Sequence, residues 1–283
     1  MTIEVNNSGT WTAPRVYINN SGTWTEPNEI HVNDSGTWKL VYKKVDVTSS
    51  TQNININTLM GSPSYPLTAV VNISGSLTIG SSSTSNPAIT TSGLPAGSKV
   101  FLIIGSGTYV VGKGGVGGSR GPGTSANNIY PGTAGGTALY TRVTTYLDNS
   151  GTIGGGGGGG GSGGVTYLTG QAYDDYTGGG GGGAGNDVGA GGTSPVWAPG
   201  TNSGTLTTGG AGVQWASSGG SSEQQTGSYG GNGGNLGSAG SNGTPLQSSG
   251  GNTNTGGAAG NAIDGVSYVT KKVAGTITGG EIN

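Results

Sequence analysis

The sequence predicts a mainly β and irregular fold with almost no helix, in which a small β domain precedes a glycine-rich bundle with protruding loops. Three observations predict it: a triplicated N-terminal motif, alternating apolar segments in the middle, and 66 glycines in 283 residues, only eight of them in the first 104. Helices disfavour glycine, and an alternation of period two favours strands. We expect β-hairpin repeats at 1–45, a β platform domain at 46–111, the bundle at 112–262 and a closing β segment at 263–283.

The first region repeats one motif three times. NNSGTW occurs at Asn6–Trp11 and at Asn19–Trp24, and NDSGTW occurs at Asn33–Trp38. Asn-Ser-Gly between β-prone residues is typical of a hairpin turn, because Asn and Gly tolerate a positive φ. Pro14 and Pro27 interrupt the strands, so we expect each repeat to be a separate small unit.

The tryptophans of these repeats, Trp11, Trp24 and Trp38, allow two interpretations. They could together form one small core, because a single hairpin cannot bury a tryptophan alone. They could instead be apolar anchors that attach the chain to a threefold-symmetric partner, with one hairpin per subunit.

The middle section, residues 52–112, alternates like strands and contains turn clusters such as GSPSYP and SGLPAGS. Val100–Ile104 and Tyr109–Val111 are its most hydrophobic strands and the best candidates for a β core. We expect this core to be the platform from which the first glycine segment starts. The C-terminal NAIDGVSYVTKKVAGTITGGEIN alternates again and is expected to close the domain, back on the middle section.

The glycines recur every third residue, at Gly112, Gly115, Gly118 and Gly121, and again along Gly231–Gly243. A period of three belongs to polyproline II geometry, which has no internal hydrogen bonds. Neighbouring helices can supply the missing partners if glycine lets their backbones approach closely. The sequence therefore predicts a bundle of polyglycine II helices, in which a central helix needs glycine on all three faces.

This criterion ranks the glycine runs. Gly178–Gly183 is predicted to be central and Gly231–Gly243 more peripheral. A collagen helix is disfavoured because the register breaks and the chain holds only 11 prolines. A flexible linker is disfavoured because aromatic residues lie between the runs.

The segments between the glycine runs carry the candidate binding residues. Tyrosine combined with Ser, Gly and Asn is the composition of a recognition surface, and loops on a rigid scaffold are where binding residues concentrate. The candidates are Tyr130, Tyr167, Tyr173, Asp174, Asp175, Tyr176, Trp197, Trp215 and Tyr229. We expect Tyr140 and Tyr146 to fold back and cover the sides of the bundle instead, because ALYTRVTTYL alternates like a strand.

The direction of successive glycine helices would decide where these loops lie. If consecutive helices run antiparallel, the loops alternate between the two ends of the bundle. Loops 124–153, 193–208 and 244–255 would then share one end, and loops 165–177 and 213–229 the other.

Composition excludes several functions. Charged residues make up 8% of the chain and the net charge is −2, so nucleic acid is not an expected partner. The absence of cysteine removes disulfides and thiolate metal sites. The longest apolar run, Val100–Ile104, is too short for membrane insertion, and MTIEVNNSG lacks the features of a secretion signal.

Motifs for catalysis or cofactors are equally weak. GTYVVGKG at Gly107–Gly114 approaches a phosphate-binding loop, but Gly114 replaces the required Ser or Thr and no helix can follow. The chain has one histidine, His31, and no paired acid and base, so we predict no enzyme and no cofactor. Asp174, Asp175 and Asp187 could hold an adventitious Ca²⁺ or be solvated loop carboxylates, and we predict no metal site.

The glycine runs Gly154–Gly161, Gly178–Gly185 and Gly230–Gly240, with the segments between them, resemble the glycine-rich receptor-binding proteins at the tips of bacteriophage tail fibres. The likeness is greatest to the tip adhesin of T-even-type long tail fibres. LPAGSKVFLIIGSGTYVVGKGGVGG before the bundle and AIDGVSYVTKKVAGTITGG near the C-terminus extend it over about residues 90–283. The SGTW repeats depart from the attachment domain of that family.

The resemblance implies a phage tail-fibre or tail-tip adhesin without enzymatic activity. Its partners would be a bacterial outer-surface receptor, either protein or polysaccharide, and a fibre or tail-tip protein to which Trp11, Trp24 and Trp38 attach. Two alternatives stay open at this point: a structural or adaptor (decoration) protein of the virion, and an ice-binding protein, which would need a flat and regular Ala/Thr face.

Overall fold

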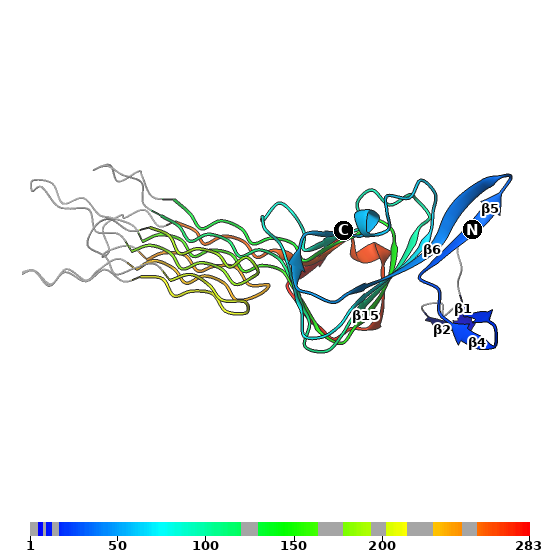
Figure 1. The fold of residues 1–283 in the computed structure, drawn as a ribbon. Coiled ribbons are helices and arrows are strands. Elements are labelled where there is room, and N and C mark those ends of the chain that lie inside the picture. Colours follow the sequence, from blue (N-terminus) through cyan, green and yellow to red (C-terminus); the bar gives the residue numbers. More distant parts are fainter. Residues whose placement is uncertain are drawn as a thin grey trace, which may run out of the picture.

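The computed structural model describes residues 5–7, 10–12, 17–119, 130–163, 178–193, 202–213, 229–244 and 254–283. Figure 1 shows a β domain with glycine-rich segments extending from one side and the short N-terminal hairpins on the opposite side. Within the described residues the helical elements are α1 (Ile56–Leu59) and the 3₁₀ turn η1 (Val266–Tyr268). The expectation of a mainly β fold with almost no helix is confirmed.

Each SGTW repeat forms an antiparallel hairpin with the same register, in which the first Asn of the motif lies opposite the Trp. The hairpins pair β1 (Val5–Asn7) with β2 (Thr10–Thr12), β3 (Ile18–Asn20) with β4 (Thr23–Thr25), and β5 (Glu29–Asp34) with β6 (Thr37–Val47). The first two are separate two-stranded sheets, as expected, but the third belongs to a six-stranded sheet.

The hairpin turns use the motif differently from the expectation that asparagine takes the positive φ. Ser21 and Gly22 have φ of 52° and 87°, which places both central turn residues in the left-handed region. The side-chain oxygen of Asn19 accepts the Gly22 N–H at 2.8 Å. The third hairpin repeats this geometry at Ser35 and Gly36.

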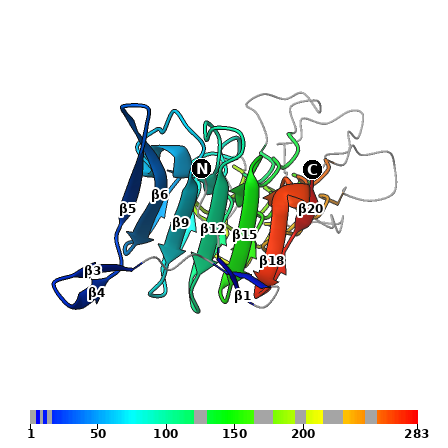
Figure 2. The same ribbon diagram turned by 90° about the vertical axis from the view of Figure 1, so that its right-hand side faces the viewer.

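The β domain is a three-sided parallel β-helix. Along the described chain from β6 to β20, five successive coils each add one strand to each of three sheets. The first sheet, seen face-on in Figure 2, contains β5, β6, β9 (Thr68–Ile73), β12 (Lys99–Ile104), β15 (Thr144–Asn149) and β18 (Val269–Val273). The second contains β7 (Thr51–Gln52), β10 (Thr78–Gly80), β13 (Tyr109–Val111), β16 (Thr152–Gly154) and β19 (Thr276–Thr278). The third contains β8 (Ile54–Asn55), β11 (Ile89–Thr90), β14 (Leu139–Tyr140), β17 (Asn261–Asp264) and β20 (Gly280–Ile282).

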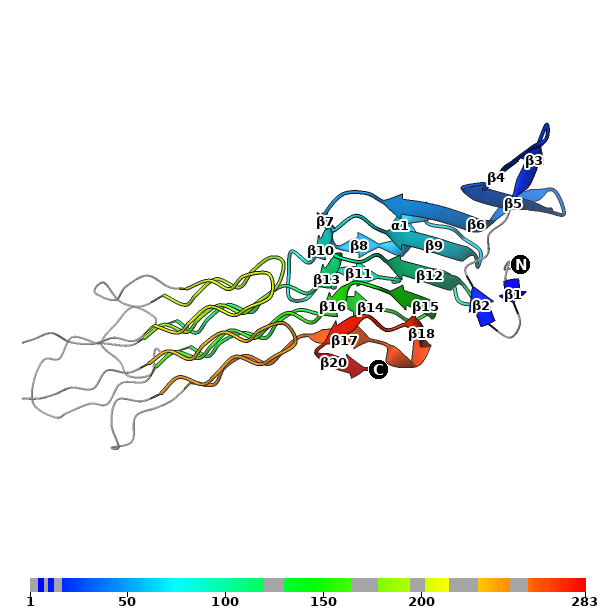
Figure 3. The same ribbon diagram turned by 90° about the horizontal axis from the view of Figure 1, so that it is seen from below.

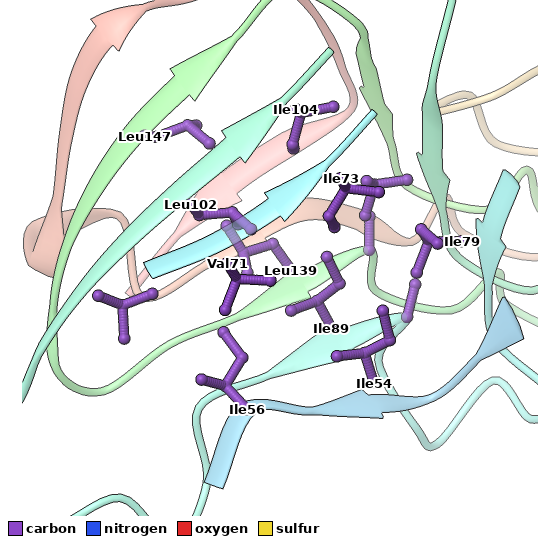
Figure 4. Close-up of a cluster of buried hydrophobic side chains, with 14 of the residues drawn as sticks. Ile54, Ile56, Val71, Ile73, Ile79, Ile89, Leu102, Ile104, Leu139 and Leu147 are labelled. Atoms are coloured by element: carbon purple, nitrogen blue, oxygen red, sulfur yellow. The ribbon is translucent and has the colours of Figure 1, made fainter. Parts of the chain in front are cut away.

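Apolar side chains from the three sheets fill the interior of the β-helix (Figure 4). The parallel register stacks like residues on successive coils, as for Val71, Leu102 and Leu147 of the first sheet, all fully buried. Ile54, Ile89 and Leu139 stack likewise on the third sheet. The predicted core strands at Val100–Ile104 and Tyr109–Val111 are thereby confirmed.

Two differences from the expected organisation concern the later strands. β14, β15 and β16 belong to the β-helix, although they lie inside the range 112–262 expected for the bundle. The C-terminal strands β18 to β20 pair with β15 to β17 rather than with the middle section. Tyr140 and Tyr146 lie in strands β14 and β15 of the β-helix and not on the sides of the bundle, as the alternation of ALYTRVTTYL allowed. Tyr146 stacks there on Phe101, with ring centroids 4.7 Å apart.

The glycine bundle consists of two insertions into the β-helix, residues 112–138 between β13 and β14 and residues 155–260 between β16 and β17. Figure 3 shows the segments leaving the domain beside these strands. The parallel β13–β16 ladder runs directly into the bundle: Val111 pairs with Gly154, and the Gly112 N–H then donates to the Gly154 carbonyl at 3.0 Å.

Hydrogen bonds between backbones hold the bundle together and recur every third residue. Gly115 donates to Gly157 and Gly118 to Gly160, three residues further along both segments. Ten segments are described in the bundle: 112–119, 130–136, 154–163, 178–185, 188–193, 202–205, 209–213, 229–235, 238–244 and 254–260.

Segments 154–163 and 178–185 each form backbone hydrogen bonds with six neighbouring segments, whereas segment 238–244 bonds with three among those described. The ranking of Gly178–Gly183 as central and Gly231–Gly243 as more peripheral is therefore confirmed. The two central segments are hydrogen-bonded to each other. The described bundle therefore contains two rings of six segments, and each central segment is also a member of the ring around the other.

Glycine is required in the central segment because a Cβ would overlap a neighbouring backbone. At Gly158, Gly159 and Gly160 the overlapped carbonyls belong to Gly257, Val116 and Gly231, which lie in three different segments. The same three segments recur in the same order along Gly155–Gly161. Polyglycine II geometry requires this period of three, and the polyglycine II conformation itself stays a prediction.

Candidate functional site

One end of the bundle, which we call the free end, carries most of the described residues that flank segments 120–129, 164–177, 194–201, 214–228 and 245–253. Hydrogen bonds at this end link Ser119 with Tyr130, Gly163 with Gly178, and Tyr229 with Thr244. Nine of the ten flanking residues lie at this end: Ser119, Tyr130, Gly163, Gly178, Thr193, Val213, Tyr229, Thr244 and Asn254. The tenth, Asn202, lies further down the bundle, where its carbonyl accepts the Gly182 N–H at 3.0 Å. We refer to these nine residues as the roots.

The opposite end of the bundle is closed by short turns that contact the β-helix. The Asn186 carbonyl accepts the Ser81 N–H at 2.6 Å, and Gln52 Nε2 donates to the Asn186 side chain at 3.0 Å. Leu236, from another turn, packs with Val111 of β13. The predicted alternation of loops between the two ends is therefore wrong: each glycine hairpin turns briefly at the β-helix, and the roots all lie at the free end.

Two of the candidate binding residues are described, and both are roots at the free end. Tyr130 has 55% of its surface exposed and Tyr229 has 46%. The backbone of Tyr130 donates to the Ser119 carbonyl at 2.8 Å, so its ring projects from a fixed main chain. The other seven candidates lie outside the described residues; they are Tyr167, Tyr173, Asp174, Asp175, Tyr176, Trp197 and Trp215.

The two residues that flank segment 164–177 lie at the centre of the free end. Its roots, Gly163 and Gly178, are joined by a hydrogen bond of 2.9 Å and end the two central segments. This segment contains five of the candidate residues, from Tyr167 to Tyr176. Residues 120–129 and 245–253 have roots that neighbour Gly163, because both Tyr130 and Asn254 bond with Ser162.

Sequence reasoning missed the polar side chains that join the roots. Ser162 is fully buried, donates its hydroxyl to the Tyr130 carbonyl at 3.1 Å and accepts from Asn254 Nδ2 at 3.0 Å. At the surface of the bundle, the side-chain oxygens of Asn232 and Asn242 accept the N–H groups of Gly212 and Gly256 at 2.9 and 3.0 Å. Two features of the sequence could have indicated these side chains: a serine directly after eight glycines, and the repeat GGNGGN.

At the other extremity of the molecule, the second and third hairpins expose their tryptophans. Trp24 is 65% exposed and Trp38 is 67% exposed, so the interpretation that they form one small core is wrong for these two. The side chain of Trp11 lies outside the described residues. Tyr65 lies next to the third hairpin, where Lys39 Nζ stands 4.3 Å from the centre of its ring.

Charges concentrate on the third hairpin. Lys39 bonds Asp34 at 2.5 Å and lowers the pKa of that carboxyl, and the hydrogen bond from Lys43 lowers the pKa of Glu29 in the same way. Burial, aided by two nearby carboxylates, raises the pKa of Tyr42 to about 12. Among the described residues of the bundle, Lys113 and Asp187 supply the charges, and their groups lie 3.4 Å apart.

The described residues contain no cluster of three potential metal-ligating side chains, and Asp187 pairs with Lys113 instead. Asp174 and Asp175, the other candidates for Ca²⁺, lie outside the described residues. The chain after Val111 enters the glycine bundle without a helix, which leaves the phosphate-loop match at Gly107–Gly114 without its structural context. No helix in the described part of the chain is long and apolar enough to cross a membrane.

The structure thus joins a β-helix, whose N-terminal hairpins expose two tryptophans, to a glycine bundle whose free end carries the roots of the segments with candidate binding residues. The family model for the phage tail fibre adhesin Gp38 matches residues 42–282, so the chain belongs to this family of tail-fibre adhesins. Its location is therefore the tail fibre of a virion.

A solved structure of similar fold is the crystal structure of the gp37-gp38 adhesin tip complex of the bacteriophage S16 long tail fiber. The two chains align with a TM-score of 0.51 and 22% sequence identity, over 86% of this chain and 83% of that chain. No curated protein matches the sequence.

Proposed function

We propose that the free end of the bundle binds a receptor on the bacterial outer surface, either an outer-membrane protein or a polysaccharide. The observation that carries this proposal is the position of the nine roots, which flank five chain segments and lie at the end most distant from the β-helix. Receptor contacts are assigned to Tyr130, Tyr167, Tyr173, Asp174, Asp175, Tyr176, Trp197, Trp215 and Tyr229. The glycines are then a scaffold, and the residues that interrupt them make the contacts.

The N-terminal hairpins are proposed to attach the adhesin to a fibre protein through Trp11, Trp24 and Trp38. The exposure of Trp24 and Trp38 supports this role, because exposed indoles are strong anchors at protein interfaces. The similar solved structure is a complex of gp38 with gp37, which supports a fibre protein as the partner. Three hairpins of equal register fit a trimeric fibre, with one hairpin for each subunit.

Adhesion on this proposal needs no catalysis and no cofactor. Binding at the free end would use aromatic area and adaptable hydrogen bonds. The β-helix would join the two binding extremities and keep them apart. Each region then has one role. Attachment belongs to 1–45, the platform to 46–111, receptor presentation to 112–262 and closure to 263–283. Strands β14 to β16 are counted in the platform.

The receptor proposal is tested by exchanging segments 120–129, 164–177, 194–201, 214–228 and 245–253 for those of a family member with another host. The chimeric phage is expected to adsorb to the donor's host. The control exchanges residues that face outward midway along the bundle, such as Ala211 and Ala239, and should leave host range unchanged. Unchanged adsorption after all five exchanges would contradict the proposal.

The attachment proposal is tested with Trp24→Ala and Trp38→Ala together. Co-purification of the adhesin with its fibre protein should then be lost. Tyr17→Ala is the matched control, because Tyr17 is an exposed aromatic residue beside the second hairpin but outside the SGTW motif. Undiminished co-purification of the double variant would assign attachment to another surface.

A further inference from the structure

We propose that Ser162 is a positioning residue that ties together the roots of three segments at the free end, and so sets the geometry of the receptor-binding surface. This inference rests on the proposed function of that end. Its hydroxyl bonds Tyr130 and Asn254, the first described residues after segments 120–129 and 245–253. Its own backbone precedes Gly163, the root of segment 164–177.

The position of Ser162 in the glycine register explains why a side chain occurs there. Gly156 and Gly159 lie on the same face, six and three residues earlier, and the carbonyls of Lys113 and Val116 occupy the space of any Cβ. The next carbonyl along that row belongs to Ser119, and it accepts the Tyr130 N–H at 2.8 Å. Ser162 is thus the first position on this face of the central segment that accommodates a side chain.

The hydroxyl of Ser162 both donates and accepts a hydrogen bond although its residue is completely buried. It donates to a main-chain carbonyl and accepts from an amide, so both of its hydrogen-bonding roles join different segments. Removing it would leave the Tyr130 carbonyl and the Asn254 amide without this partner in a water-poor site. The rest of the bundle would keep its backbone hydrogen bonds, but Tyr130 and Asn254 would no longer be joined through the Ser162 hydroxyl.

The test compares the full-length protein with Ser162→Ala, which removes the hydroxyl and leaves the Cβ. Amide exchange should become about tenfold faster for Tyr130 and for Gly243, whose N–H donates to the Asn254 carbonyl. The amide of Val213, a root bonded to Gly179, should be unaffected. Ser241→Ala, at an exposed serine of a neighbouring segment, is the matched control and should leave all three amides unchanged.

Binding to intact cells of the host bacterium is the second measurement. Ser162→Ala should dissociate several-fold faster than the wild type while its melting temperature stays within a few degrees. Asn254→Ala, which breaks the same bond from the partner side, should have a similar effect, and the double variant should add little to either single change. If Ser162→Ala fails to fold, Asn254→Ala still decides the question.

Three outcomes overturn the inference. If amide exchange at Tyr130 and Gly243 is unchanged in Ser162→Ala, then Ser162 does not connect the roots. Faster exchange of all amides together with a lower melting temperature assigns Ser162 to general stability. If amide exchange is faster only at Tyr130 and Gly243 but cell binding is unaltered, Ser162 connects the roots without setting the geometry of the receptor-binding surface. A wild-type protein that binds no host cells contradicts the proposed function instead, and the exchange data still report whether Ser162 joins the roots.

Discussion

The β-helix and the glycine bundle both stack parallel and antiparallel extended segments, but they are held together by different atoms. In the β-helix, side chains such as Leu102 and Leu147 fill an interior between three sheets. In the bundle, the central run Gly154–Gly161 has no side chains, and its backbone bonds six neighbouring segments. The two regions share one continuous ladder at Val111 and Gly112, where one kind of packing replaces the other.

This difference determines where the chain can vary. A side-chain core accepts other apolar residues of similar volume. The backbone lattice accepts no Cβ at central positions such as Gly158, Gly159 and Gly160, because the neighbouring carbonyls already occupy that space. Variation in the bundle is therefore confined to its outward faces and its free end, which is where the proposed receptor contacts lie. Four substitutions or conditions test the contrast, in order of expected effect.

The largest effect is expected from Gly159→Ala. The added methyl group would overlap the carbonyl of Val116, and the backbones on the other faces block any retreat. We expect a loss of about 4 kcal/mol or more in unfolding free energy, measured by denaturant titration. Ala239→Gly, at an exposed position of an outer segment, is the control and should cost less than about 1 kcal/mol. Equal tolerance of the two changes would contradict a close-packed bundle.

Leu102→Ala should be the next largest change, because it opens a cavity in the β-helix core. Leu102 is fully buried and stacks on Val71 and Leu147. The expected cost is about 3 kcal/mol. Leu102→Met, which nearly conserves volume, should cost less than about 1.5 kcal/mol. A bundle glycine has no such tolerant replacement, so a similar cost for alanine and methionine at Leu102 would remove the distinction between the regions.

Asn232→Ala is expected to have a smaller effect at the surface of the bundle. The side-chain oxygen of Asn232 accepts the Gly212 N–H, as a neighbouring backbone carbonyl does in the interior. Its loss should cost about 1 kcal/mol and speed amide exchange at Gly212. Asn232→Asp keeps the acceptor and should leave that exchange slow. Fast exchange in both variants would show that the acceptor is not what protects Gly212.

The smallest effect is a dependence on pH confined to the third hairpin. The pKa values of Asp34 and Glu29 are lowered in the folded state by Lys39 and Lys43 respectively, from ordinary values of 3.8 and 4.5. A lowered folded pKa gives stability that is complete above about pH 5 and is lost as the pH falls through the folded value. NMR shifts of β5 and β6 should change in this acid range. Shifts of the bundle glycines should stay constant, and equal changes in both regions would contradict the prediction.

The sequence predicted the bundle better than the β-helix. A period of three in glycine reports a backbone contact directly, so Gly178–Gly183 could be ranked as central from its composition alone. The β-helix repeat was hidden because two insertions separate its coils: β12 and β15 pair residue by residue, although the first insertion lies between them in sequence. Alternation identified the strands, but it carries no information on which strands lie side by side.

The candidate site was predicted in part. Aromatic residues between the glycine runs identified Tyr130 and Tyr229, which are exposed roots. The prediction that loops alternate between ends failed because short turns lie inside stretches that were interpreted as single glycine runs. The turn at Leu236–Gly237, for example, divides the run Gly231–Gly243 into two segments. Ser162 was missed because its role depends on two residues that are 32 and 92 positions away in sequence.

Amide exchange of the glycines in the bundle centre tests the central claim most directly. The account predicts that the N–H groups of Gly156–Gly160 and Gly180–Gly183 exchange as slowly as those of β9 and β12, because each donates to a backbone carbonyl inside the bundle. Slow exchange would show that a chain without side chains forms a scaffold as ordered as the β-helix. Exchange at the rate of an unstructured glycine-rich chain would contradict the account.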